Sequence, residues 1–236
     1  MAPAAAAPDE LAATARDCQA VGASVVVLPP LAPAAAREAV AALREETDLL
    51  VQAADPALGA DLVVLPSGAP EPRLAELAAE LARCGGTPVL EAGTLADLAV
   101  LPELAARTGA AGVHVSLVLG AAGGLPGTLP ALAACLERLP AGVSWTAAGL
   151  GGAALPVLLA ALSAGGHVRA GAADGPPEAG DPARADLQLV ARAAGLARIA
   201  QRPPLSPDAA RTLLLGPPAG SPAPRSAPDP TSVEIR

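Results

Sequence analysis

The sequence contains no lysine, asparagine, phenylalanine or tyrosine, and only one methionine and one tryptophan. The missing residue types share AT-rich codons, so we attribute their absence to a very GC-rich genome. Their absence also excludes particular chemistry. Without lysine the chain cannot form a Schiff base or supply the lysine of a phosphate-binding P-loop, and without tyrosine it has no phenolic acid.

Basic charge is scarce as well, because 15 arginines face 23 acidic residues and the net charge is −8. An acidic protein of this kind is a poor partner for nucleic acid or for an anionic membrane. The three cysteines, Cys18, Cys84 and Cys135, are odd in number and form no CxxC motif. They indicate buried thiols in a reducing compartment, with a reactive thiol as the alternative. Since the N-terminus lacks the pattern of a signal peptide, we expect a cytoplasmic protein.

Two long stretches, 108–136 and 139–168, contain no charged residue, which raises the question of a membrane span. Glycine pairs and prolines divide both stretches into pieces that are too short to cross a bilayer. Buried parallel strands that alternate with helices explain the two stretches better, because such strands are apolar on both faces. We therefore expect no membrane insertion.

Seven Val- and Leu-rich segments alternate with Ala-rich segments whose apolar residues recur at helical spacing. The expected strands are 24–28, 48–53, 61–65, 87–91, 112–120, 143–149 and 167–171. The expected helices are 9–21, 34–46, 73–83, 95–108, 128–139, 155–164 and 183–201, with a further helix starting at Ser206. This alternation predicts an α/β protein with a parallel sheet, either a barrel or a doubly wound sheet.

The strand count bears on the domain organisation. A closed barrel of this class needs eight strands, and this chain shows seven and begins with a helix, so its first strand is missing. We assign residues 1–215 to this incomplete barrel. Residues 216–236 are rich in Pro, Ala, Gly and Ser and cannot bury enough surface to fold, so we expect a disordered tail.

Charged residues stand at the ends of two expected strands, where parallel α/β proteins place their chemistry. Arg169 and Asp174 flank the end of the last strand, five positions apart. Such a pair can orient a substrate carboxylate and supply a general base, or it can be a plain ion pair at the rim. The spacing does not choose between these interpretations. Glu91 ends an earlier strand and is a weaker candidate for substrate binding.

The loop 120–127 follows a strand and precedes a helix, and it contains Gly123 and Gly124. Backbone N–H groups in such a loop can bind an anion, although a plain glycine turn fits equally well. The two histidines, His114 and His167, are interpreted as structural, since the segment 143–149 separates their strands. No HxH, HExxH or CxxC motif is present, so the residues predict no transition-metal site.

Several motifs in the last third of the chain carry a family resemblance. They are Trp145-Thr146-Ala147-Ala148-Gly149-Leu150-Gly151, Gly165-Gly166-His167-Val168-Arg169-Ala170-Gly171 and Ser206-Pro207-Asp208-Ala209-Ala210-Arg211. With these motifs, residues 7–215 resemble the β-keto acid cleavage enzymes, also called 3-keto-5-aminohexanoate cleavage enzymes. The resemblance implies an eight-stranded (β/α) barrel, commonly a homo-oligomer. It also implies acyl exchange between a β-keto acid and acetyl-CoA, assisted by a divalent metal, typically zinc.

The chain departs from the family at the metal ligands that the resemblance implies. Val27 and Pro29 stand where the family has His-x-His, and Ala173 stands where it has a glutamate. Arg169 and the proton-transfer residue Asp174 are retained. We therefore expect no cofactor and a metal-free relative that is catalytically impaired or inactive, with a β-keto acid or CoA ester as its partner.

Two alternatives to this interpretation stay open. One is an active, metal-independent acyltransferase or C–C lyase that uses Arg169 and Asp174. The other is a poorly folded relic, because a barrel without one of its strands exposes two sheet edges.

Overall fold

The centre of the molecule is a sheet of seven parallel strands, each hydrogen-bonded to the next strand along the chain. The computed structural model describes residues 7–65, 70–84, 86–109, 112–174 and 182–216. The strands are β1 (Val25–Val27), β2 (Leu50–Ala53), β3 (Leu62–Val64), β4 (Thr87–Ala92), β5 (His114–Leu119), β6 (Ser144–Gly149) and β7 (His167–Val168). Each strand falls within or overlaps a predicted segment, so the predicted barrel-like α/β fold is confirmed.

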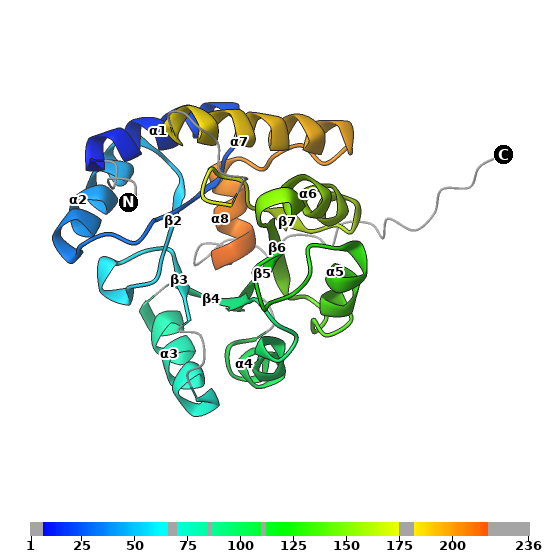
Figure 1. Ribbon diagram of the computed structural model, residues 1–236. Coiled ribbons are helices and arrows are strands. Elements are labelled where there is room, and N and C mark those ends of the chain that lie inside the picture. The colour runs from blue at the N-terminus through cyan, green and yellow to red at the C-terminus, as the bar shows by residue number, and fades with distance from the viewer. Residues whose placement is uncertain (1–6, 66–69, 85, 110–111, 175–181, 217–236) are drawn as a thin grey trace.

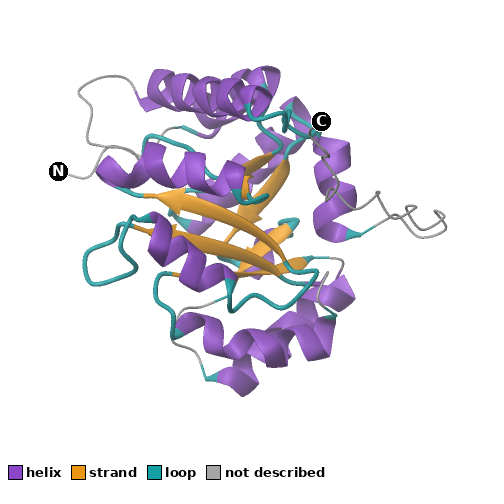
Figure 2. Ribbon diagram, turned by 90° about the vertical axis from the view of Figure 1, so that its right-hand side faces the viewer, coloured by secondary structure: helices purple, strands orange, loops and turns teal. Residues whose placement is uncertain are grey.

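Helices surround the curled sheet on its outer face (Figures 1 and 2). They are α1 (Pro8–Val21), α2 (Pro33–Glu46), α3 (Glu71–Cys84), α4 (Leu101–Thr108), α5 (Leu129–Leu136), α6 (Ala154–Ser163) and α7 (Pro182–Ile199). Short 3-10 turns also occur among the described residues, namely η1 (Pro56–Leu58), η2 (Asp97–Val100) and η4 (Gly151–Ala153). The predicted helix 95–108 is thus divided into η2 and α4. The Asp97 carboxylate accepts hydrogen bonds from the N–H groups of Gly93 and Thr94 and so fixes the start of η2.

Side chains alternate between the two faces of each strand, as the pleat of a β-strand requires. The outward side chains, such as Val63, Val115 and Leu117, belong to the large apolar cluster beneath the helices. The inward side chains of the first four strands, including Leu50 and Val89, form a separate cluster. The sheet therefore has an apolar layer on each side of its first half.

Helix α8 (Pro207–Leu215) covers the inward cluster. It begins as predicted, because the Ser206 side chain accepts a hydrogen bond from the N–H of Ala209. At its far end the Thr87 hydroxyl donates to the Leu214 carbonyl at 2.8 Å. Thr87 opens β4, so α8 closes the interior at the amino ends of the strands. The contact of α8 lies opposite to the carboxyl ends of the strands, where this fold class carries its chemistry.

The outer strands β1 and β7 each pair with one neighbour only in the described part of the chain. Helices α1 and α7 nevertheless pack against each other (Figure 1), so the helical layer is continuous where the sheet is interrupted. Val27, on the outermost strand, is 41% exposed. The described sheet is one strand short of a closed barrel, as the sequence predicted.

The two uncharged stretches of the sequence form β5, β6 and β7 together with α5 and α6. None of the described helices combines the length and the apolar character that crossing a bilayer requires. The segment predicted as a tail, 216–236, lies outside the described residues except for Gly216.

Candidate functional site

Polar side chains face inward along the second half of the sheet, where α8 does not cover it. The outward positions on β5 and β6 include Val115, Leu117 and Ala147, and Val113 and Val143 pack outward just before these strands. The residues between them therefore point inward, and they are His114, Ser116, Ser144 and Thr146. On β7, Val168 packs outward, which directs His167 and Arg169 to the interior. The inward side chains of β5, β6 and β7 are thus largely polar, in contrast to the apolar side chains that α8 covers.

Arg169 is the centre of an ion-pair group at the carboxyl ends of the strands. Its Nε donates to Oδ2 of Asp174 at 2.9 Å, and its Nη2 donates to Oδ1 at 3.0 Å. Its Nη1 donates to Oε2 of Glu91, on β4, at 3.2 Å. The side chains of Arg169 and Asp174 are 21% and 14% exposed, and that of Glu91 is 38% exposed. The structure therefore brings together the three charged residues that the sequence singled out.

The backbone around Arg169 explains why the chain places the ion pair here. The Arg169 N–H continues the ladder by donating to the carbonyl of Ala147, although β7 ends at Val168. The chain then turns, and the N–H of Asp174 donates to the carbonyl of Gly171 at 3.1 Å. The carbonyl of Asp174 accepts from the N–H of Gly151, after β6, at 2.8 Å. The predicted strand 167–171 is shorter than expected, because β7 ends at Val168 and the turn starts at Gly171.

The charges of the group do not balance, since one guanidinium faces two carboxylates. Burial works against the charged form of Arg169, but the hydrogen bonds and charges of Asp174 and Glu91 outweigh it and raise its pKa. Arg169 therefore stays charged at any physiological pH. The group carries a net negative charge, which opposes the approach of an anionic ligand to Arg169.

His114 lies deeper in the interior and is fully bonded. Its two ring nitrogens lie 2.9 Å from the Ser144 hydroxyl and 2.8 Å from the Thr146 hydroxyl. Burial, with a smaller effect from His167, lowers the pKa of His114 to about 3, so the ring is neutral. Burial also lowers the pKa of His167, and the charge of Arg202 contributes.

The interpretation of His114 as structural agrees with these bonds, but the expected separation from His167 is wrong. The two rings lie 6.5 Å apart, because β5, β6 and β7 are neighbours with inward side chains. The hydroxyl partners on β6 were missed in the sequence. Their only signal was the spacing of Ser144 and Thr146, two positions apart in a strand.

The loop that contains Gly123 and Gly124 is tied to the sheet rather than left open. The N–H of Gly124 donates to Ala121, and the N–H of Leu125 donates to the carbonyl of Gly93 at 2.7 Å. A side chain on Gly124 would meet that same carbonyl oxygen at 2.8 Å, so close packing requires glycine here. These contacts favour the plain glycine turn, and binding of an anion by Gly123 and Gly124 stays a prediction.

The positions where the resemblance implies metal ligands do not fit a metal. Val27 faces the interior from β1, and Pro29 and Ala173 are exposed in loops. None of these side chains has a donor atom. Across the described residues, no group of three or more His, Cys, Asp or Glu side chains has an arrangement suited to a metal ion. Cys18 and Cys135 are free and buried, and burial raises the pKa of both thiols, that of Cys18 to about 11.

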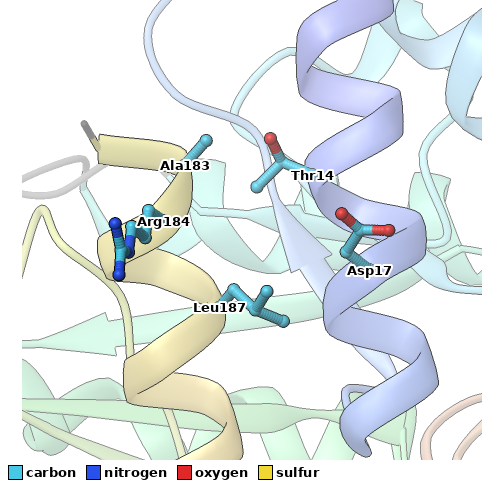
Figure 3. A pocket seen from close by; sticks show the side chains of 5 residues that line it. All are labelled: Thr14, Asp17, Ala183, Arg184 and Leu187. Atoms are coloured by element: carbon cyan, nitrogen blue, oxygen red, sulfur yellow. The ribbon is translucent and has the colours of Figure 1, made fainter.

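Two hollows of the surface lie outside the group around Arg169. One, of about 240 Å³, lies between α1 and α7 and is lined by Thr14, Asp17, Ala183, Arg184 and Leu187 (Figure 3). The other, of about 370 Å³, is lined by residues of the α2–β2 region and by Asp61, Asp208 and Arg211. Arg211 already pairs with Asp61 at 2.9 Å there. Neither hollow includes Arg169, Asp174 or Glu91.

Comparison with known proteins places these features in a family. A 3-keto-5-aminohexanoate cleavage enzyme from Acetoanaerobium sticklandii is 33% identical over 103 residues, which are 43% of this chain and 38% of that protein. The alignment thus spans well under half of the curated relative.

A solved structure of (S)-3-O-geranylgeranylglyceryl phosphate synthase from Thermoplasma acidophilum, in complex with sn-glycerol-1-phosphate, is 16% identical. It covers 80% of this chain and 88% of its own, but its TM-score of 0.44 is too low for any argument. Residues 63–215, by contrast, match the sequence profile of the beta-keto acid cleavage enzymes. The matched region includes Glu91, Arg169, Asp174 and helix α8, and the chain belongs to the beta-keto acid cleavage enzyme family.

Proposed function

We propose that this chain is a metal-independent member of its family that binds a β-keto acid or CoA ester at Arg169 and is impaired in acyl exchange. One observation carries the proposal. The Arg169–Asp174 pair is intact at the carboxyl ends of the strands, whereas Val27, Pro29 and Ala173 offer no ligand atom. The site retains an arginine that can bind a substrate carboxylate, but the three positions of the metal ligands have no side chain that can bind a metal ion.

The hydrogen-bonding capacity of Arg169 supports binding of a carboxylate. A guanidinium has five N–H donors, and three of them have partners among the described residues. The other two donors have no partner within the described part of the chain and can bind a ligand, and a planar guanidinium suits a carboxylate well. Glu91 is the weaker of the two carboxylate partners, because it makes one bond and its side chain is 38% exposed. A ligand carboxylate therefore displaces Glu91 more easily than Asp174.

The same geometry argues for impaired catalysis. Both oxygens of Asp174 accept hydrogen bonds from Arg169, so the carboxylate is held against the guanidinium instead of being free to approach a substrate. A metal ion that polarises a keto group supplies several kcal/mol of transition-state stabilisation, and the described residues offer no group of ligands for one.

The alternative is an active, metal-independent acyltransferase or C–C lyase. The position of Asp174 in a turn rather than in a strand favours this alternative, because a small change in the turn would free one carboxylate oxygen. Arg169 would then hold the substrate carboxylate and Asp174 would take the proton. The two functions share one site and differ in whether turnover follows binding.

Metal content and turnover of the purified protein separate the two functions. We expect less than one zinc in ten chains, and binding of a β-keto acid that Arg169→Met abolishes and Arg107→Met leaves unchanged. Arg107 is a suitable control because it is exposed and, among the described residues, pairs with Glu103 on its own helix. Acetyl-CoA-dependent turnover without metal would establish the alternative. Stoichiometric zinc with turnover, or no binding of any keto acid, would overturn the proposal.

The net charge and the cysteines support the remaining expectations about binding partners and cellular compartment. A net charge of −8 supports a small-molecule partner rather than nucleic acid, and the free, buried Cys18 and Cys135 are compatible with the cytoplasm. Assignment of residues 1–215 to one barrel, and a homo-oligomeric state, stay proposals. Size-exclusion chromatography with light scattering tests the oligomeric state directly.

A further inference from the structure

We propose that Asp186, on α7, is a positioning residue that holds the turn 171–174 so that Asp174 meets Arg169 with both oxygens. The inference deepens the proposed function and rests on it for the role of the ion pair. Asp186 does not contact Arg169 in any described hydrogen bond. It acts through the backbone between them.

The contact that carries the proposal joins α7 to the turn. The N–H of Ala172 donates to Oδ1 of Asp186 at 2.6 Å, and the acceptor lies 14 residues further along the chain. A hydrogen bond to a carboxylate is shorter and stronger than one between neutral groups. Ala172 lies only two positions before Asp174, so Asp186 fixes the backbone at the middle of the turn.

Gly171 makes room for this contact. A Cβ atom on Gly171 would stand 3.1 Å from Oδ1 of Asp186, which is closer than ordinary packing allows. Glycine at this position therefore lets the carboxylate approach the backbone of the turn. The backbone at Gly171 is not in the left-handed region, so close approach and not chain reversal requires the glycine.

Two other bonds hold the turn, and neither can replace Asp186. The N–H of Asp174 donates to Gly171, which closes the turn on itself, and the carbonyl of Asp174 accepts from Gly151 after β6. These bonds fix the turn at its end and against the sheet. Asp186 alone ties its middle to a helix, among the described hydrogen bonds.

The charged carboxylate of Asp186 is destabilised by partial burial and by the nearby charge of Asp174, which an acid on the open surface would not be. Burial raises the pKa of its carboxyl and the charge of Asp174 adds to the increase, while the bond from Ala172 opposes it. A second carboxylate beside Asp174 is thus held in place against desolvation and repulsion. A neutral acceptor of the same shape would make the same bond without the repulsion, so asparagine should serve as well.

The test follows the Arg169 side chain directly and needs no activity. In ¹⁵N-labelled protein, the Nε–Hε signal of Arg169 is identified by its loss in Arg169→Lys, and its exchange with water is measured. We expect Asp186→Ala to accelerate that exchange about tenfold, as the loss of one hydrogen bond of the turn implies. Asp186→Asn should leave the exchange rate within about twofold of the wild type, because the amide oxygen still accepts from Ala172.

Asp17→Ala is the matched control. Asp17 is an exposed acid on the neighbouring helix α1, and together with Asp186 it raises the pKa of Cys18, but it holds no backbone of the turn. If Asp17→Ala accelerates the exchange as much as Asp186→Ala, or if Asp186→Ala leaves it unchanged, the proposal is overturned. Should Asp186→Ala fail to fold, Gly171→Ala tests the same contact from the other side and should also accelerate exchange.

The proposed function has its own readout. In protein that turns over a keto acid, Asp186→Ala should lower kcat more than it changes KM, and Asp186→Asn should restore kcat. If the wild type neither binds nor turns over a keto acid, the proposed function fails. The exchange of the Arg169 Hε still decides whether Asp186 positions the turn.

Discussion

Arg169 donates to both carboxylate oxygens of Asp174, at 2.9 Å from Nε and 3.0 Å from Nη2, and the two residues are five positions apart. A two-point contact of this kind fixes the direction of the guanidinium as well as its distance. It leaves the Nη1 side of Arg169 directed to Glu91, across the interior on β4. The pair is thus both a structural link at the end of β7 and the anchor of the candidate site.

Removal of one partner of this pair should destabilise the protein. Asp174→Ala leaves a largely buried guanidinium without its main partner, and we expect a loss of about 1–3 kcal/mol in the free energy of unfolding. Arg169→Met should cost a similar amount. The double variant should lose at least 1 kcal/mol less than the sum of the two, because each single change leaves the other charge unpaired. Urea unfolding of the four proteins measures the coupling, and simple additivity would contradict it.

Glu91→Gln should strengthen the binding of a keto acid. Glu91 competes with an anionic ligand for Arg169, and its replacement by a neutral amide removes one of the two negative charges at the site. A half-exposed ion pair contributes about 0.2–1 kcal/mol, which corresponds to an increase in affinity of up to about fivefold. Calorimetric titration gives the affinity, with Glu103→Gln as the control on an exposed helix pair. Weaker binding by Glu91→Gln would show that Glu91 helps to hold the ligand.

His114 should make the stability of the protein fall at mildly acidic pH. Burial lowers the pKa of His114 to about 3, whereas an unfolded chain takes up a proton near pH 6.5. Between these values the unfolded state binds more protons, so the free energy of unfolding decreases as the pH falls below about 6.5. From pH 7 to pH 5 we expect a loss of about 2 kcal/mol from this residue.

The variant His114→Gln tests this linkage, because glutamine does not titrate and can still bond to a neighbouring hydroxyl. Urea unfolding at pH 5, 6 and 7 should give a shallower pH dependence for the variant than for the wild type. His167 titrates in the same direction and is unchanged in the variant, so some pH dependence should persist. Identical slopes in the two proteins would show that His114 is not the cause.

Local sequence patterns predicted the helices and strands of this fold. They did not predict how these elements are placed, which depends on contacts between residues far apart in the sequence. The runs 24–28 and 112–120 predict buried strands because Val and Leu are concentrated between glycines and turn residues. The position of α8 inside the sheet did not follow from its sequence, which predicts only an amphipathic helix. Its place depends on partners such as Thr87, whose bond to Leu214 spans 127 residues.

In the candidate site, too, neighbouring residues could be predicted from the sequence, and contacts between distant residues could not. Arg169 and Asp174 could be predicted together because they lie five positions apart at a strand end. The contact of Arg169 with Glu91 spans 78 residues and depends on the curl of the sheet between β4 and β7. Asp186 gave no signal in the sequence, because an acid in the first turns of a helix is common and stabilises the helix dipole wherever it occurs.

Gly166→Ala should destabilise the protein and change the environment of its single tryptophan. A Cβ atom on Gly166 would overlap the ring of Trp145, so the ring or the backbone would have to move. Overpacking of this kind costs about 1–3 kcal/mol. Gly152→Ala is the matched control, because nothing lies within 4 Å of its Cβ position. Trp145 fluorescence reports both the shift and the unfolding midpoint, and equal midpoints for the two variants would contradict the expected clash.

The open edge of β1 should promote association between molecules. In the described sheet β1 pairs only with β2, and its run Val25–Val27 presents unpaired backbone groups and the partly exposed Val27. A lysine at position 27 opposes pairing with another chain, because the added strand would help to enclose its charge on the inward face of the sheet.

We therefore expect Val27→Lys to raise several-fold the protein concentration at which light scattering first increases. Val27→Thr is the matched control, since threonine keeps the β-branched shape without a charge. If both variants aggregate at the concentration of the wild type, the edge of β1 is not the surface through which the molecules associate. If Val27→Lys alone stays monomeric, the interrupted sheet limits the solubility of the chain, and pairing of β1 with an additional strand should stabilise it.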